Sequence, residues 1–133
     1  MTTSSQAPAD WPGISRGRRL SLLAGVKVLD LTHFLAGPFG SMVLADMGAS
    51  VLKVEQLTGD AVRKSPPYFY EGDSAYFLSV NRNKESIALD LRTPPGQEVM
   101  RRLVERADVV LDNLRAPQRA ALGLSFDDLK KIN

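Results

Sequence analysis

Residues 26–55 read VKVLDLTHFLAGPFGSMVLADMGASVLKVE, and this segment carries the strongest signal of the fold class. Its first part, residues 26–32, is a short apolar run rich in β-formers, which predicts a buried strand. Pro38 suits the first turn of a helix, and Gly48 is placed where a glycine ends one. Residues 50–55 predict a second strand. Strand, helix and strand in this order form a βαβ unit, whose crossover requires parallel strands.

The same alternation recurs further along the chain. Residues 86–91 predict a strand, and Thr93, followed by two prolines, predicts the N-cap of the next helix. Residues 108–112 predict another strand, and Ser125 predicts the cap of a short helix over residues 126–131. The pattern favours an α/β layer with a mostly parallel sheet flanked by helices. With four strands and no strand after the last helix, the layer is expected to be incomplete as it stands.

Residues 56–85 interrupt the alternation. This stretch contains two consecutive prolines and five aromatic residues. Loops longer than about 12–15 residues are usually functional or disordered, and the aromatic content argues against disorder. We expect an ordered excursion that covers another part of the molecule.

Residues 1–20 are rich in Ser, Thr, Pro and Arg and predict a flexible N-terminal tail, which leaves residues 21–133 as the folded part. The formal net charge of the chain is +2. Arg16, Arg18 and Arg19 against Asp10 place this whole excess in the tail. A nucleic-acid partner is therefore not expected, because such domains usually carry a basic excess on the folded surface.

No apolar stretch reaches the roughly 18–20 residues that cross a bilayer, and the N-terminus lacks the apolar region of a secretory signal. Its Ser, Thr and Arg content is also found in mitochondrial transit peptides, but Pro8 and Pro12 would break the amphipathic helix that these need. We expect no membrane partner and a cytoplasmic location. With no cysteine and one histidine, the chain has no thiolate or multi-histidine metal site, so no metal is expected.

Three segments follow predicted strands and indicate a ligand site. Leu35, Arg92 and Asn113 all come after the carboxyl end of a strand, so in a parallel sheet they share one rim. Ligands of open α/β sheets bind at this rim. Glu55 is spaced from Gly37 like the acidic residue that holds a ribose in dinucleotide-binding folds, but the turn lacks the Gly-x-Gly-x-x-Gly pattern.

Three other polar residues are read as structural. The lone His33 has no identifiable carboxylate partner, so a hydrogen-bonded structural role is favoured over that of a general base. Asp46 and Asp60 are assigned to a helix end and to a Gly-Asp turn.

An ordered set of short motifs from Leu22 to Asn133 resembles the N-terminal part of the family III CoA-transferases, which include formyl-CoA and carnitine CoA-transferases and the related α-methylacyl-CoA racemases. The matching stretches are Val28-Leu29-Asp30-Leu31-Thr32, Ala36-Gly37-Pro38-Phe39, Leu44-Ala45-Asp46-Met47-Gly48-Ala49, Val51-Leu52-Lys53-Val54-Glu55, Gly59-Asp60, Tyr76-Phe77, Asn81-Arg82-Asn83-Lys84, Ile87-Ala88-Leu89-Asp90-Leu91 and Ala107-Asp108-Val109-Val110.

The resemblance implies a partial Rossmann-like domain that binds the coenzyme A of an acyl-CoA. Such enzymes move CoA between an acyl-CoA and a carboxylic acid, and they form interlocked homodimers. Arg92 would face a phosphate. The CoA contacts that the resemblance implies are Leu35, Ala36, Leu89, Asp90, Leu91, Arg92, Asn113, Leu114 and Arg115.

The family's nucleophilic aspartate lies beyond the last residue of this sequence. We therefore assign no catalytic residue and expect the chain alone to be inactive. Two alternatives stay open: a segment of an α-methylacyl-CoA racemase, or a non-catalytic fragment that binds a nucleotide or docks on a homologue. The sequence departs from the family pattern at Gln56 and Ala121, where basic residues are common, and at Leu35, where formyl-CoA transferases carry Gln.

Overall fold

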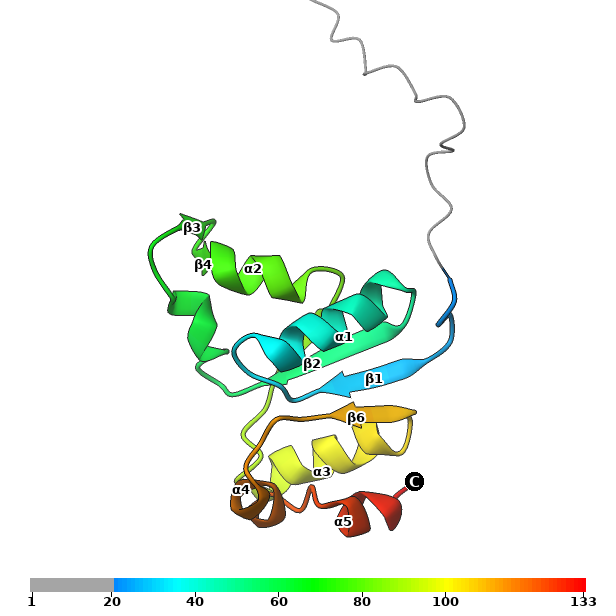
Figure 1. Ribbon diagram of the computed structural model, residues 1–133. Helices are drawn as coiled ribbons and strands as arrows, with labels where there is room; N and C mark the ends of the chain where they lie inside the picture. The colour runs from blue at the N-terminus through cyan, green and yellow to red at the C-terminus, as the bar shows by residue number, and fades with distance from the viewer. Residues whose placement is uncertain (1–20) are drawn as a thin grey trace, which may run out of the picture.

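The computed structural model describes residues 21–133, so the flexible tail predicted for residues 1–20 lies outside the described residues (Figure 1). At its centre is a four-stranded sheet with the order β5-β2-β1-β6, and every neighbouring pair is parallel. The predicted parallel α/β layer is therefore confirmed. The strands are β1 (Lys27–Asp30), β2 (Ser50–Glu55), β5 (Glu85–Ala88) and β6 (Val109–Leu111).

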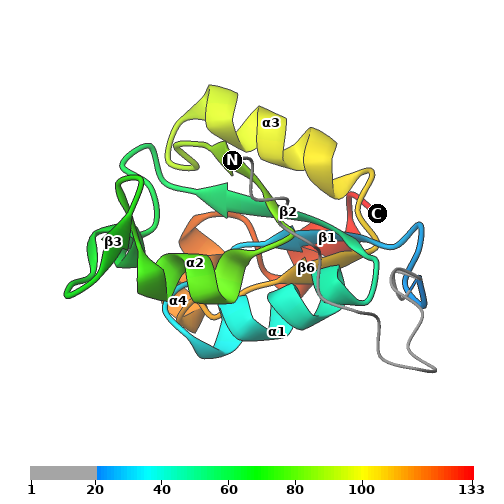
Figure 2. The same cartoon turned by 90° about the horizontal axis from the view of Figure 1, so that it is seen from above.

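Helices cover both faces of this sheet and make three layers (Figures 1 and 2). On one face lie α1 (Ala36–Asp46) and α2 (Ala75–Asn81), and on the other lie α3 (Pro94–Val104), α4 (Ala116–Ala121) and α5 (Phe126–Lys130). The chain passes from β1 to β2 and β5 in one direction. The crossover through α3 then brings β6 to the other side of β1. Strand order therefore reverses between β1 and β6, which is where open α/β sheets bind ligands.

The side chains of the strands form two apolar cores, one on each face of the sheet, because successive side chains of a strand point to opposite faces. On the α1 side, Val28 packs with Ala45 and Val51. On the α3 side, Leu29 packs in a cluster with Met100, among other buried residues. Both inner strands thus contribute apolar side chains to both faces, as expected for a sheet covered on each side, and their carboxyl ends also bury the charged residues Asp30, Lys53 and Glu55.

The predicted helix caps are confirmed. Thr93 Oγ1 accepts a hydrogen bond from Gly96 N at 3.3 Å, and Ser125 Oγ accepts one from Asp128 N at 3.2 Å. Gly48 follows the end of α1 with φ +102°, a conformation that glycine adopts at little cost.

The strand predicted over residues 86–91 is shorter in the structure. It ends at Ala88 because the chain turns there, with Thr93 N donating to Asp90 O at 3.1 Å. Gly96 lies against this turn: a Cβ at that position would stand 2.0 Å from Asp90 O.

The excursion over residues 56–85 is ordered, as predicted. It contains the 3₁₀ helix η1 (Ala61–Lys64), the hairpin strands β3 (Phe69–Tyr70) and β4 (Asp73–Ser74), and α2. Phe77 is its buried aromatic anchor, with the Arg63 guanidinium 3.8 Å from its ring centre.

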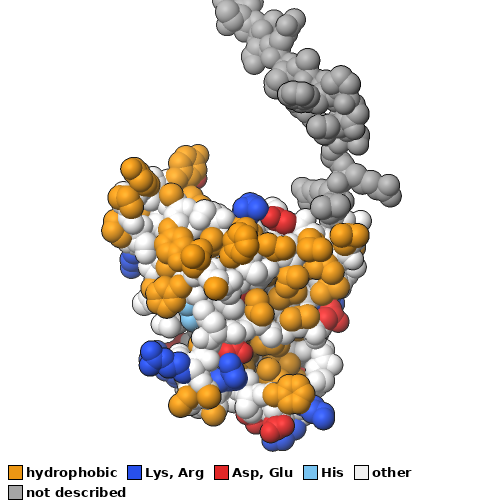
Figure 3. Space-filling view, in the orientation of Figure 1, with side chains coloured by type: hydrophobic (Ala, Val, Ile, Leu, Met, Phe, Trp, Pro, Cys, Tyr) orange, Lys and Arg blue, Asp and Glu red, His pale blue; other side chains and the backbone are white. Residues whose placement is uncertain are grey.

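The expectation that the aromatic residues of this excursion cover another part of the molecule is only partly met. Tyr68, Phe69 and Tyr70 are exposed. Phe39 and Val43 of α1 are exposed as well, and Figure 3 shows apolar side chains gathered on the face of the molecule that carries α1, α2 and the hairpin. Within residues 21–133, no helix has both the length and the apolar character required to cross a membrane.

Candidate functional site

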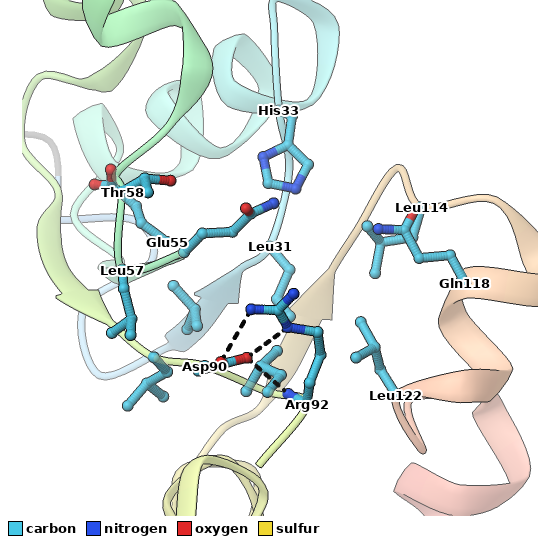
Figure 4. A pocket seen from close by; sticks show the side chains of 14 residues that line it. Leu31, His33, Glu55, Leu57, Thr58, Asp90, Arg92, Leu114, Gln118 and Leu122 are labelled. Atoms are coloured by element: carbon cyan, nitrogen blue, oxygen red, sulfur yellow. Dashed lines mark hydrogen bonds and ion pairs between the residues drawn. The ribbon is translucent and has the colours of Figure 1, made fainter.

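A cavity of about 330 Å³ lies at the carboxyl ends of the parallel strands (Figure 4). The turns after β1, β2 and β5 form part of its wall, and α4 closes the opposite side. Its volume is at the lower end of the range typical of ligand pockets. The lining residues are Leu31, His33, Val54, Glu55, Gln56, Leu57, Thr58, Leu89, Asp90, Leu91, Arg92, Leu114, Gln118 and Leu122.

Arg92 is the cation of this cavity. Its Nε and Nη2 donate to the two carboxylate oxygens of Asp90 at 2.9 and 3.0 Å, and these hydrogen bonds hold the pKa of Asp90 below its usual value. The Arg92 side chain is nevertheless 83% exposed, so water screens the ion pair. Figure 4 shows the guanidinium folded over Asp90, facing Gln118 and Leu122 across the cavity. The arginine is thus oriented by Asp90 and open to an anionic ligand.

The structure brings part of the predicted contact set together. Leu89, Asp90, Leu91, Arg92 and Leu114 line the cavity.

The other predicted contacts lie at the same edge of the sheet but outside the cavity lining. Leu35 and Ala36 stand at the exposed start of α1, and Arg115 is exposed at the start of α4. The side-chain amide of Asn113 makes two hydrogen bonds to the main chain of His33. Its Oδ1 accepts from His33 N at 3.0 Å, and its Nδ2 donates to His33 O at 2.8 Å.

Several lining residues were missed from the sequence. Gln56 follows the end of β2 directly, and its place after a strand was a usable signal. Gln118 and Leu122 reach the cavity only because α4, an element that the sequence did not predict, folds back over the sheet edge.

Glu55 has a structural role that differs from holding a ribose. Both carboxylate oxygens accept hydrogen bonds at 2.7 Å from Arg63, and further bonds come from Ser86 and from Asp60 N. Burial opposes ionisation, but these donors outweigh it and lower the pKa of Glu55 to about 2. Arg63 also binds Asp73 at 2.8 Å. This network ties the excursion to the end of β2.

A second buried network supports the turn after β1. Asp30 accepts hydrogen bonds from Ser41 and Thr32, and its Oδ2 lies 2.9 Å from Lys84 Nζ. Burial favours the neutral acid, but the hydroxyl donors and the ammonium together hold the pKa of Asp30 below its ordinary value. Lys84 Nζ also donates to Pro38 O at 2.9 Å, so one lysine links β1 and α1.

Asp60 is more than the turn residue that the sequence suggested. It is buried, caps η1 by accepting from Val62 N, and its Oδ2 lies 2.9 Å from Lys53 Nζ. The same oxygen lies 4.0 Å from His33 Nδ1, which supplies the carboxylate neighbour that the sequence did not reveal. Within residues 21–133, Asp60 Oδ2 is also the one buried side-chain polar atom that accepts no hydrogen bond of good geometry.

A further groove of about 430 Å³ lies among α3, α4 and α5, and most of its walls are apolar. It lies away from the strand ends, and Arg101 is its cation. None of the predicted contacts except Leu91 reaches it. Residues 21–133 contain no group of three or more acidic or histidine side chains placed to hold a metal ion.

Comparison with known proteins places this architecture in a family. The chain is 45% identical over 118 residues to a succinyl-CoA:mesaconate CoA-transferase of Haloarcula hispanica, which covers 86% of this chain and 30% of that protein. It is 45% identical over 111 residues to the human succinyl-CoA:glutarate CoA-transferase, and the match covers 83% of this chain and 25% of that protein. A crystal structure of a CAIB/BAIF family protein from Brucella suis superposes with a TM-score of 0.79 at 44% identity. The match covers 84% of this chain and 30% of that one.

The chain therefore spans about a third or less of the length of these relatives. Residues 23–133, nearly all of the described part, match the family described as CoA-transferase family III. The resemblance seen in the sequence motifs is confirmed. The chain belongs to CoA-transferase family III.

Proposed function

We propose that residues 21–133 form the CoA-binding part of an enzyme that moves CoA between an acyl-CoA and a carboxylic acid. The observation that carries the proposal is the cavity at the strand ends, where Arg92 is exposed and oriented. The succinyl-CoA transferases named above support it, because each has CoA in its substrate and aligns with this stretch.

The chemistry of the cavity fits a ligand with a flat base and phosphates. Leu57, Leu91 and Leu122 offer apolar surface against which a base can pack. Gln56 and Gln118 offer amide donors and acceptors, and an arginine fork suits phosphate oxygens. We propose that the cavity holds one portion of CoA, the base and its neighbouring phosphates.

The rest of the ligand would follow the rim. Leu35 and Ala36 at the start of α1, and residues 113–115 after β6, lie at the same edge of the sheet as the cavity. We propose that these segments contact the part of CoA that extends from the cavity. The exposed side chains of Phe34 and Leu35 supply apolar surface for it.

Replacing Arg92 by alanine is expected to weaken CoA binding by about tenfold or more, because a hydrogen bond to a charged group contributes about 1.5–3 kcal/mol. Isothermal titration calorimetry measures the change. Arg102→Ala is the matched control: Arg102 is an arginine of similar exposure on α3, paired with Glu98 and outside the cavity lining. Equal affinities for wild type and Arg92→Ala, or equal binding of CoA and NAD by the wild-type protein, would overturn the assignment.

The transfer reaction itself is a proposal for the whole enzyme. Its test is an assay in which an acyl-CoA and a free carboxylic acid exchange CoA, with deuterated solvent present. Formation of the new thioester supports a transferase. Solvent deuterium at the α-carbon of the acyl group, without thioester exchange, would instead indicate a racemase.

A further inference from the structure

One side chain joins the turn after β1 to the turn after β6. His33 N donates to Asn113 Oδ1 at 3.0 Å, and Asn113 Nδ2 donates to His33 O at 2.8 Å. The amide thus satisfies both main-chain polar groups of His33 at once. The contact joins residues 80 positions apart in sequence, at the place where the strand order reverses.

The position of this contact continues the β1–β6 ladder. Asp30 pairs with Leu111, and Leu31 N donates to Leu111 O at 2.8 Å. In a parallel ladder alternate residues bond to the neighbouring strand, so His33, two residues after Leu31, is the next residue in line to do so. The Asn113 side chain makes these bonds in place of a backbone peptide group. The segments that follow β1 and β6 can therefore move apart beyond the sheet, while the segment just after β1 stays fixed.

The same segment is held from its other side. Lys53 Nζ donates to Thr32 O at 2.7 Å, and Gly37 packs so closely on Thr32 that a Cβ would lie 2.4 Å from Thr32 Cβ. Phe34 follows with φ +68°, a conformation that a bulky residue adopts only where its surroundings impose it. The exposed loop 34–36 thus depends on contacts to Thr32 and His33.

We propose that Asn113 is a positioning residue for CoA binding: its side chain fixes the main chain of His33 and so sets the loop 34–36 at the rim. The Asn113 side chain, engaged with His33, acts on the ligand through this loop, and the contact proposed above for residues 113–115 falls to their main chain and to Leu114 and Arg115. The inference rests on the proposed function of the cavity. If Asn113 has this role, CoA binding requires both hydrogen bonds of its amide, the one from His33 N and the one to His33 O. Neither alanine nor aspartate can make both.

The test uses Asn113→Ala and Asn113→Asp in the chain described above. Asn113→Ala removes both bonds, whereas Asn113→Asp keeps an acceptor for His33 N and loses the donor to His33 O. Asn133→Ala is the matched control, because Asn133 Nδ2 also donates to main-chain carbonyls, those of Val104 and Ala107, far from the rim. Amide hydrogen exchange of His33 and calorimetric titration with CoA are measured for all four proteins.

We expect exchange at His33 to become about tenfold faster in Asn113→Ala, with His33 partly protected in Asn113→Asp. CoA affinity should fall by about tenfold in both variants and stay unchanged in Asn133→Ala. Faster exchange with unchanged CoA affinity would overturn the proposal, as would an equal loss of affinity in Asn133→Ala. Wild-type protein that fails to bind CoA would instead refute the proposed function on which the inference rests.

Discussion

Replacing Lys84 by methionine is expected to lower the free energy of unfolding by about 3–5 kcal/mol, the usual cost of removing one partner of a buried ion pair. The Lys84 side chain is 2% exposed and the Asp30 side chain 0%. Without the ammonium, the carboxylate keeps its bonds from Ser41 and Thr32 but loses the cation 2.9 Å from its Oδ2. Urea unfolding at neutral pH, followed by circular dichroism, measures the loss.

Lys64→Met is the control for this change, because Lys64 is exposed, and it should alter the free energy of unfolding by less than about 0.5 kcal/mol. The double variant Asp30→Asn with Lys84→Met should lose less than the sum of the single variants, since the two groups interact directly. A Lys84→Met protein as stable as the Lys64→Met control would show that the pair does not support the turn after β1.

Glu55→Gln is expected to lower the free energy of unfolding by up to about 3 kcal/mol at pH 7. The carboxyl group has a pKa of about 2 in the folded protein against 4.5 for the ordinary group, so the folded state favours the ionised form. This contribution is fully present above pH 4.5 and is lost as the pH falls toward 2. The gap between wild type and variant should therefore close over that interval in urea titrations at successive pH values.

Glu98→Gln provides the comparison for Glu55. Glu98 also binds two arginines, Arg101 and Arg102, but on the open surface of α3. Solvent screens such pairs, so this variant should be nearly as stable as wild type. If both variants lost the same stability, or if the Glu55→Gln gap did not depend on pH, burial of the Glu55–Arg63 pair would not be the cause.

The sequence was sufficient for the elements whose signals are local. The strands β1, β2 and β6 and the caps of α3 and α5 follow from apolar runs and from Thr93 and Ser125. Helix α2 was missed because the prolines and aromatic residues before it obscure its start at Ser74, which caps it by accepting from Phe77 N. Helix α4 is six residues long with a proline in its first turn and no buried residue, so it has no apolar stripe to detect.

In the candidate site, too, the residues with a local sequence signal were predicted and those that depend on tertiary contacts were not. Arg92 was found because residues that follow the carboxyl end of a strand lie at the rim, although β5 ends at Ala88 and a turn separates it from Arg92. The role of Asp60 depends on Lys53 and that of Asn113 on His33, and both contacts form only when the chain is folded. The approach of Gln118 to the cavity likewise depends on how α4 packs, for which no local pattern exists.

A nuclear magnetic resonance titration of the ¹⁵N-labelled chain with CoA tests whether the cavity at the strand ends binds CoA. We predict amide shifts in residues 56–58 and 89–92 and at Leu114 and Gln118, which line the cavity. Residues 101–104, at the C-terminal end of α3, should not shift. If the cavity amides of the folded protein stay unchanged at saturating CoA, or if the shifts map to the groove among α3, α4 and α5, the cavity does not bind CoA.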